Sequence, residues 1–320
     1  MDLIQKAGIA MRHVKSNGGN GYRFFAQEMN ARALAEMALS NDLRHALERD
    51  EMVLHYQTQV DTFSGEIVGV EALLRWQHHD LGLLMPKDFI GLAEENGLIV
   101  PIGDWVLHEA CRQTKLWHDA GHSRLFVSVN VSALQFKQGN LAQTAMKAIG
   151  ASGLEPRFVE LELTESMIMS HFEQTQATLK TLKGFGVRFS IDDFGTGYSS
   201  LNYLKHFPID KLQIDISFIT DVATAPDNAA IVKAIIAMGH NLELKVIAEG
   251  VETEAQAGYL RTLHCDDMQG YYFSRPAPAQ EIVALLGAHQ PLRTGAEDER
   301  VLLLVDDEAN VISALKRVLR

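Results

Sequence analysis

Residues 189–200 read FSIDDFGTGYSS, in which a short apolar run ends in two adjacent aspartates, Asp192 and Asp193, followed by Gly-Thr-Gly. Like charges this close repel and raise each other's pKa unless a cation lies between them. One interpretation is an aspartate-rich turn that merely ends a strand. The other is a strand end that carries metal ligands.

Outward from this stretch, short β-branched runs alternate with segments of helical length from about residue 86 to 288. The runs are RLFVSVNVS, RFVELELT, VRFSIDD, DKLQID, LKVIAEG and DDMQGYYF. Before them, MVLHYQTQVDTFSGEIVGVEALLRW contains two strand-like runs around a Ser-Gly turn, which predicts a hairpin. Strands separated by helices indicate βαβ units and a parallel sheet. About seven or eight such strands predict an α/β fold, a TIM-like barrel rather than an open sheet.

The composition of the 320 residues allows a large buried core, since 47% are hydrophobic and 22% are charged. A formal net charge of −12 argues against binding a nucleic-acid polymer or an anionic membrane, because both need basic patches. The two cysteines, Cys111 and Cys265, form no CxxC motif and indicate reduced thiols in the cytoplasm. No apolar run approaches the roughly 18 residues of a membrane span, so this segment is expected to make no membrane contact, although a longer parent protein could be tethered.

Polar side chains fall near the carboxyl ends of six predicted strands, where TIM barrels build their active sites. They are Glu71, Asn130, Glu162, the pair Asp192 and Asp193, Glu249, and Gln269. Carboxylates with an amide suit a hard cation, Mg²⁺ or Mn²⁺, and their surplus favours two ions. Two ions assist in-line attack on a phosphodiester. The 13 histidines show no zinc-ligand spacing, and His78-His79 is predicted to lie in a polar turn.

Several motifs in chain order carry a resemblance to a known family. EALLR (Glu71 to Arg75) is followed by PIGDWVLHEAC, SVNVS, LELTES, IDDFGTGYSSL, AEGVET and QGYYFSRP. Together they resemble EAL domains, the phosphodiesterases that linearise cyclic di-GMP, over roughly residues 40–288. The resemblance implies a (βα)8 barrel whose first strand runs antiparallel to the others, and a metal-dependent hydrolysis of cyclic di-GMP to pGpG.

The resemblance also implies roles for individual residues. The metal ligands would be Glu71, Asn130, Glu162, Asp192, Asp193 and Glu249, of which the two aspartates and Glu249 would also serve catalysis. Arg75 would grip a substrate phosphate with its planar fork of donors. The other substrate-binding positions would be Gln57, Leu73, Glu252 and Gln269. Glu165 would anchor the loop that contains the aspartate pair.

One position departs from the family pattern. The motif usually reads D-x-L-K-I-D, and here DKLQID places Gln213 at the position of the catalytic lysine. A neutral amide supplies no positive charge, and Lys211, two residues earlier, would lie about 6–7 Å further down the same strand face. Slow turnover is one expectation. A receptor that binds cyclic di-GMP without cleaving it is the alternative, and a different metal-dependent barrel enzyme is a third.

The flanks are expected to be parts of other domains. Residues 1–31 contain AMRHVKSNGGNGYRFF, which resembles the end of a GGDEF domain, and residues 32–50 are predicted to form a connecting helix. The EAL barrel is expected over 51–288 and a linker over 289–299. Residues 300–320 resemble the start of a response-regulator receiver domain. The loop and helix after Asp193 are expected to lie near a homodimer interface, as the resemblance implies.

Overall fold

The computed structural model describes the whole chain except residues 1–2, 17–19, 138–139, 171, 196–205 and 288–320. Every strand predicted from the sequence is present. The strands are β1 (Met52–Asp61), β2 (Ile67–His78), β3 (Gly82–Leu84), β4 (Phe126–Asn130), β5 (Val159–Thr164), β6 (Arg188–Phe194), β7 (Lys211–Ile214), β8 (Lys245–Ala248), β9 (Asp267–Gln269) and β10 (Ala277–Pro278).

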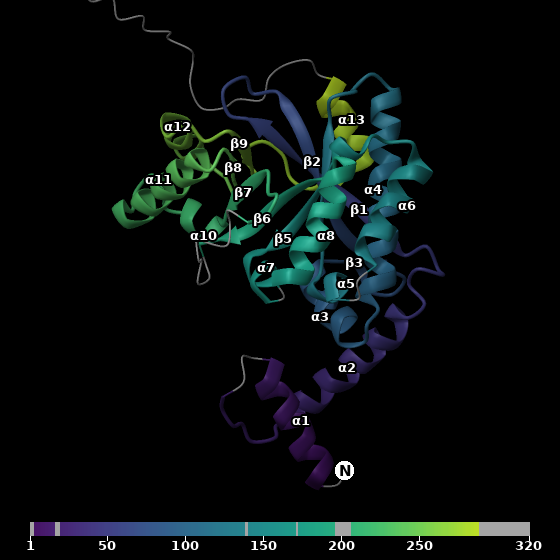
Figure 1. The fold of residues 1–320 in the computed structure, drawn as a ribbon. Coiled ribbons are helices and arrows are strands. Elements are labelled where there is room, and N and C mark those ends of the chain that lie inside the picture. Colours follow the sequence, from purple (N-terminus) through teal and green to yellow (C-terminus); the bar gives the residue numbers. More distant parts are fainter. Residues whose placement is uncertain (1–2, 17–19, 138–139, 171, 196–205, 288–320) are drawn as a thin grey trace, which may run out of the picture.

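Eight of these strands close into a barrel in the order β1-β2-β4-β5-β6-β7-β8-β9 (Figure 1). β1 pairs antiparallel with both β2 and β9, and the remaining neighbours in the barrel pair parallel. The short strands β3 and β10 extend the sheet beyond the ring. The predicted TIM-like barrel with an antiparallel first strand is therefore confirmed.

Helices connect the strands and cover the outside of the barrel (Figure 1). The described helices are α1 (Leu3–Ser16) and α2 (Gln27–Leu43) before the barrel, and α3 (Pro86–Glu95), α4 (Ile99–Asp119), α5 (Ala133–Lys137), α6 (Leu141–Ser152), α7 (Glu165–Ser170), α8 (Phe172–Phe185), α10 (Ile216–Ile219), α11 (Pro226–Asn241), α12 (Glu254–Thr262) and α13 (Ala279–Gly287) after its first strand, with a 3₁₀ turn at Pro156–Phe158. Individual residues explain where two of these helices begin or end. Thr253 and Gln256 form a capping box that starts α12. Gly153, with φ +71°, ends α6 in the left-handed conformation that favours glycine.

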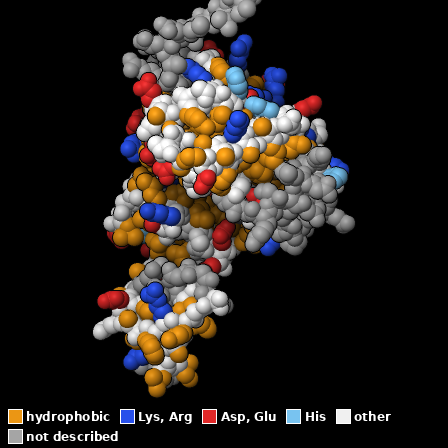
Figure 2. Space-filling model, turned by 90° about the vertical axis from the view of Figure 1, so that its left-hand side faces the viewer, with side chains coloured by type: hydrophobic (Ala, Val, Ile, Leu, Met, Phe, Trp, Pro, Cys, Tyr) orange, Lys and Arg blue, Asp and Glu red, His pale blue; other side chains and the backbone are white. Residues whose placement is uncertain are grey.

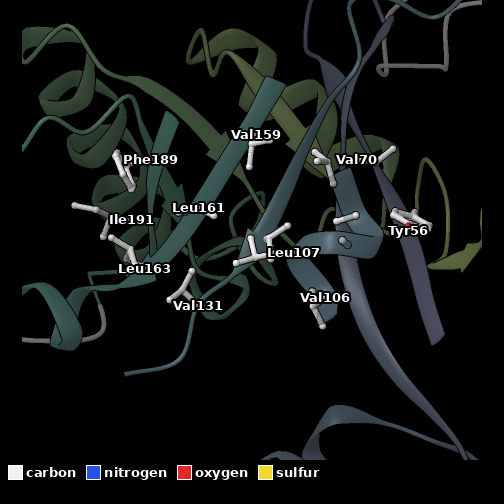
Figure 3. Close-up of a cluster of buried hydrophobic side chains, with 14 of the residues drawn as sticks. Tyr56, Val70, Val106, Leu107, Val131, Val159, Leu161, Leu163, Phe189 and Ile191 are labelled. Carbon is white, nitrogen blue, oxygen red and sulfur yellow. The ribbon is translucent and has the colours of Figure 1, made fainter. Parts of the chain in front are cut away.

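The main hydrophobic core lies between the barrel and its helices. In β5 and β6, alternate side chains point outward, and Figure 3 shows Leu161, Leu163, Phe189 and Ile191 among them. All four are at most 1% exposed. Full burial of such a side chain contributes about 1.5–3 kcal/mol. Because the outward positions are apolar, the alternating positions that face the barrel interior are available for polar side chains.

The segment before the barrel extends away from it (Figure 1). We expected a connecting helix over 32–50, whereas α2 covers Gln27–Leu43 and the chain then forms turns up to Asp50, which has φ +55°. Hydrophobic side chains lie on the surface of α1, where Leu3 is 80% and Ile4 79% exposed, and Figure 2 shows this lobe below the barrel. Among the described helices, none is both long and apolar enough to cross a membrane.

Candidate active site

The barrel interior contains two layers of polar side chains. In the lower layer, a lysine contacts carboxylates. Its centre is Lys211 of β7, which is 3% exposed. The Lys211 Nζ atom lies 3.0 Å from Glu160 Oε1 and 3.8 Å from Asp267 Oδ2, and it donates to Gln59 Oε1 at 3.1 Å. Ser128 Oγ donates to the same Glu160 Oε1 atom at 3.0 Å. These contacts join five strands, β1, β4, β5, β7 and β9, and place a lysine among the carboxylates.

The upper layer lies nearer the carboxyl ends of the parallel strands and is held by amide side chains. Asn130 Nδ2 donates to Glu71 Oε1 at 2.7 Å, and Gln269 Nε2 donates to Glu71 Oε2 at 2.5 Å. The same Gln269 nitrogen lies 3.2 Å from Gln57 Oε1. The structure therefore brings together four residues that the sequence placed far apart. Glu71 does not end its strand as expected, because β1 pairs with β2 as far as Trp76 and β3 pairs with it as far as His78.

Within the described part of the chain, Glu162 and Glu249 of the upper layer lack a cationic partner of the kind that Lys211 provides below, whereas Arg75 acts on Glu71. Both oxygens of Glu162 are buried and without a hydrogen-bond partner. Burial raises the pKa of Glu162 well above its ordinary value, and the charges of Glu71, Glu249 and Asp192 raise it further. Burial and the charges of Asp192 and Glu71 likewise raise the pKa of Glu249 well above its ordinary value. The carboxylates of the upper layer thus repel one another when charged, so each makes ionisation of its neighbours less favourable.

The aspartate pair from β6 belongs to this layer. Burial, with the charge of Asp193, raises the pKa of Asp192 to about 7. The Asp193 backbone N–H donates to Asp192 Oδ1 at 2.7 Å, and Asp193 has φ +55°, which is unusual for a residue other than glycine. Burial and the nearby Asp215 raise the pKa of Asp193. The sequence analysis missed Asp215, although its place two residues after Gln213 could have indicated it.

Other predicted positions surround the carboxylate layer. Glu165 Oε2 accepts from the Gly195 backbone N–H at 3.4 Å, at the last described residue before 196. Arg75 is 6% exposed, its Nη1 donates to the Leu74 carbonyl, and its Nε is buried without a partner. Leu73 is half-buried and lies between Glu71 and Arg75 on alternate positions of β2, and Glu252 is exposed. The loop and helix after Gly195, where we expected a dimer interface, lie outside the described residues.

Gln213 follows Lys211 by two residues on β7 and is fully buried. Its Nε2 donates to Ser190 Oγ at 3.1 Å, and its Oε1 is without a hydrogen-bond partner. Lys211, on the same strand face, is committed to Glu160 and Gln59 in the lower layer. The expectation that Lys211 does not reach the place of Gln213 agrees with these contacts.

A second polar group, Asp42, His78 and His79, brings potential ligand atoms within 4.8 Å of one another. The chemistry of His78 does not suit a metal, because its Nδ1 accepts from the backbone of Asp80 and Leu81. The neutral ring must then carry its proton on Nε2, the atom that faces Asp42 Oδ2 at 3.5 Å. Among the described residues, no other group of three His, Cys, Asp or Glu side chains brings its ligand atoms this close together.

Comparison with known proteins decides the family. The sequence profile described as "EAL domain" matches residues 40–276. The chain belongs to the EAL domain family. A curated relative, the bifunctional diguanylate cyclase/cyclic di-GMP phosphodiesterase MucR of Pseudomonas aeruginosa, is 50% identical over 283 residues, which are 88% of this chain and 41% of MucR. The cyclic di-GMP phosphodiesterase NbdA of the same organism is 44% identical over 92% of this chain and 38% of its own length.

Solved structures of EAL domains share the fold. The PaMucR phosphodiesterase in its c-di-GMP complex superposes with a TM-score of 0.75 at 51% identity, over 77% of this chain and 99% of that one. The EAL enzyme Bd1971, in its cGMP-bound form, gives a TM-score of 0.74 at 32% identity, over 80% of this chain and 71% of that one. The chain spans about two fifths of the length of the curated relatives it matches.

Proposed function

We propose that this chain is a metal-dependent phosphodiesterase that hydrolyses cyclic di-GMP to linear pGpG. The observation that carries the proposal is the contrast between the two polar layers of the barrel. The lower layer contains its own cation, Lys211, which lowers the pKa of Asp267 against the raising effect of burial, whereas among the residues that the structure describes no cation lowers the raised pKa of Glu162, and both Glu162 oxygens are buried without partners. Relatives named as cyclic di-GMP phosphodiesterases supply the substrate class.

The residues present fit hard divalent cations. The six proposed ligands offer only oxygen atoms from carboxylates and one amide, which Mg²⁺ and Mn²⁺ prefer. They are Glu71, Asn130, Glu162, Asp192, Asp193 and Glu249. Two ions, when bound, would lower the pKa of water and stabilise charge on the phosphoryl oxygens. Asn130 and Gln269 would hold Glu71 in place for this purpose through their hydrogen bonds.

The remaining residues would bind and orient the substrate. Arg75, whose Nε is buried and unpartnered, would donate to a phosphate oxygen. Gln57, Leu73, Glu252 and Gln269 would line the nucleotide site. Glu165, through Gly195, would hold the loop that follows the aspartate pair. Gln213 would donate or accept a hydrogen bond near the reacting phosphate but would supply no charge.

The alternative proposal is a receptor that binds cyclic di-GMP without cleaving it. The observation that favours it is Gln213, because the neutral amide occupies the family's lysine position and Lys211 is engaged elsewhere. Against it stands the full set of ligand positions, which a receptor could lose without penalty.

Formation of pGpG from cyclic di-GMP, followed by chromatography, tests both proposals. The wild-type chain should form pGpG slowly with Mg²⁺ or Mn²⁺ and not at all with EDTA, and Gln213→Lys should form it faster. The matched control is Gln280→Lys, which adds the same charge on α13, outside the barrel, and should leave the rate unchanged. Activity that persists in EDTA would contradict the metal-dependent mechanism. Binding without turnover in both wild type and Gln213→Lys would favour the receptor.

The domain arrangement is proposed with the function. The EAL barrel would occupy 51–288, preceded by a connecting segment at 32–50 and a GGDEF-like remnant at 1–31. The linker at 289–299 and the receiver-like segment at 300–320 lie outside the described residues. The protein would work in the cytoplasm, where a longer parent could be tethered to the membrane, and would form a homodimer through the loop and helix after Asp193.

A further inference from the structure

Large aromatic side chains are exposed at five described positions. They are Tyr22, Phe24, Phe63, Phe185 and Tyr271, each at least 50% exposed. Tyr22 and Phe24 precede the barrel, Phe63 follows the antiparallel strand β1, and Phe185 ends α8 just before β6 begins. The last two therefore lie at the amino-terminal end of the parallel strands. Tyr271 alone among the five follows the carboxyl end of a parallel barrel strand, β9, where the carboxylate layer opens.

The backbone that carries Tyr271 is fixed on both sides. Gln57 Nε2 donates to the Ser274 carbonyl at 2.9 Å, and the Tyr272 backbone N–H donates to the Val251 carbonyl at 3.0 Å. A Cβ atom added to Gly270 would lie 2.0 Å from the Val251 carbonyl oxygen, so the turn packs directly against the chain that follows β8. An exposed aromatic ring on so constrained a turn is already ordered before any ligand arrives.

One face of the Tyr271 ring is covered by a cation. The Arg275 guanidinium carbon lies 4.3 Å from the ring centroid, a cation–π contact that holds the ring in one orientation. Tyr271 also lies close enough to Arg75 to affect the pKa of that guanidinium. Gln269, two residues before Tyr271, donates to Glu71. Tyr271 thus lies near the proposed phosphate-binding arginine, and it follows by two residues an amide that contacts the carboxylate layer.

We infer that Tyr271 is a base-binding residue whose ring stacks on one guanine of the nucleotide. The inference rests on the proposed function and deepens it, because stacking would make the site favour a nucleotide over phosphodiesters that carry no base. Every base has a π-face, and an aromatic platform binds it at little entropic cost when the ring is already ordered. Arg275, behind the ring, serves as a positioning residue.

Calorimetric titration with pGpG in Mg²⁺ measures this contact without turnover of the cyclic substrate. Tyr271→Ala should weaken pGpG binding about 10- to 100-fold, the range expected for one lost base stack. Tyr271→Phe, which keeps the ring, should bind within about twofold of wild type. The matched control is Phe185→Ala, which removes an equally exposed ring at the other end of the barrel and should leave binding unchanged. The melting temperature should be unaffected by Tyr271→Ala, because the side chain is half exposed.

The fluorescence of a Tyr271→Trp variant tests stacking directly, because a purely structural role of this side chain would not make the fluorescence depend on the nucleotide. A stacked guanine quenches indole fluorescence by electron transfer, so pGpG should quench the added tryptophan above the background of the three native ones. Equal pGpG affinity of Tyr271→Ala and wild type, or an unquenched tryptophan at saturation, would overturn the inference alone. Failure of wild type to bind either pGpG or cyclic di-GMP would overturn the proposed function, and the inference with it.

Discussion

The charge of the upper layer makes the stability of the metal-free protein depend on pH in a direction that is unusual for carboxylates. Asp192 has a pKa of about 7 in the folded protein against 3.8 ordinarily. The folded state therefore binds a proton more tightly than the unfolded state does. The stabilisation from this protonated carboxyl is complete below about pH 4 and is lost as pH rises through about 7.

The size of the effect follows from these two values. They differ by about three pH units, and each unit corresponds to about 1.4 kcal/mol, so full ionisation costs the folded state about 4 kcal/mol. Part of the cost is already present at pH 5, which leaves a loss of about 2–3 kcal/mol between pH 5 and pH 8. Mg²⁺ at 100 times its dissociation constant should restore about 2.7 kcal/mol.

Asp192→Asn removes the charge while its Oδ1 can still accept from the Asp193 backbone N–H. In EDTA at pH 8, urea unfolding should show this variant to be more stable than wild type by up to about 4 kcal/mol, with a flatter pH profile. Mg²⁺ should stabilise this variant less than it stabilises wild type, because one of the six proposed ligands has lost its charge. Glu160→Gln is the matched control from the lower layer, because it leaves the buried Lys211 short of its closest partner and should destabilise the protein by about 3 kcal/mol.

Two results would refute the reasoning. One is a metal-free protein whose stability rises between pH 5 and pH 8. The other is an Asp192→Asn variant that Mg²⁺ stabilises as much as it stabilises wild type, because the aspartate could not then hold the ion.

Three further predictions concern catalysis and binding. Gln213→Lys should raise kcat about 10²–10³-fold with little change in KM, and steady-state rates that do not improve would mean that the lysine role is misassigned. Lys211→Ala should lower the urea midpoint while leaving the ratio of Gln213→Lys to wild-type kcat unchanged, since Lys211 is engaged with Glu160. Arg75→Lys keeps the charge but loses the planar fork, so calorimetry should show cyclic di-GMP binding weakened by about 1–3 kcal/mol, and full affinity would exclude a bidentate phosphate contact.

The strands were predictable because their signal is local. Runs such as VELELT alternate polar and apolar residues, and the structure places Glu160 and Glu162 inside the barrel and Leu161 outside it. The extent of β2 was not predictable from its own residues. It continues past Glu71 because β1 pairs with it as far as Trp76, a contact that depends on the partner strand.

The sequence also did not predict which charged side chains would pair inside the barrel. Glu160 and Glu162 are two residues apart on one strand face, yet one contacts Lys211 and the other has no partner. The difference comes from a lysine some fifty residues later in the chain, whose height in the barrel is set by the register of β6 and β7. Asp215, which acts on Asp193, was missed although it ends the same DKLQID motif as Gln213.

The lower layer, centred on Lys211, fills one end of the barrel interior. Lys211, Gln59, Glu160 and Asp267 fill the interior beneath Gln213 and are each at most 3% exposed. Under the proposed function, ions and nucleotide would therefore enter and leave at the carboxyl ends of the strands. A linear product that dissociates slowly from this end would then block the next cyclic substrate, and product release would limit the rate.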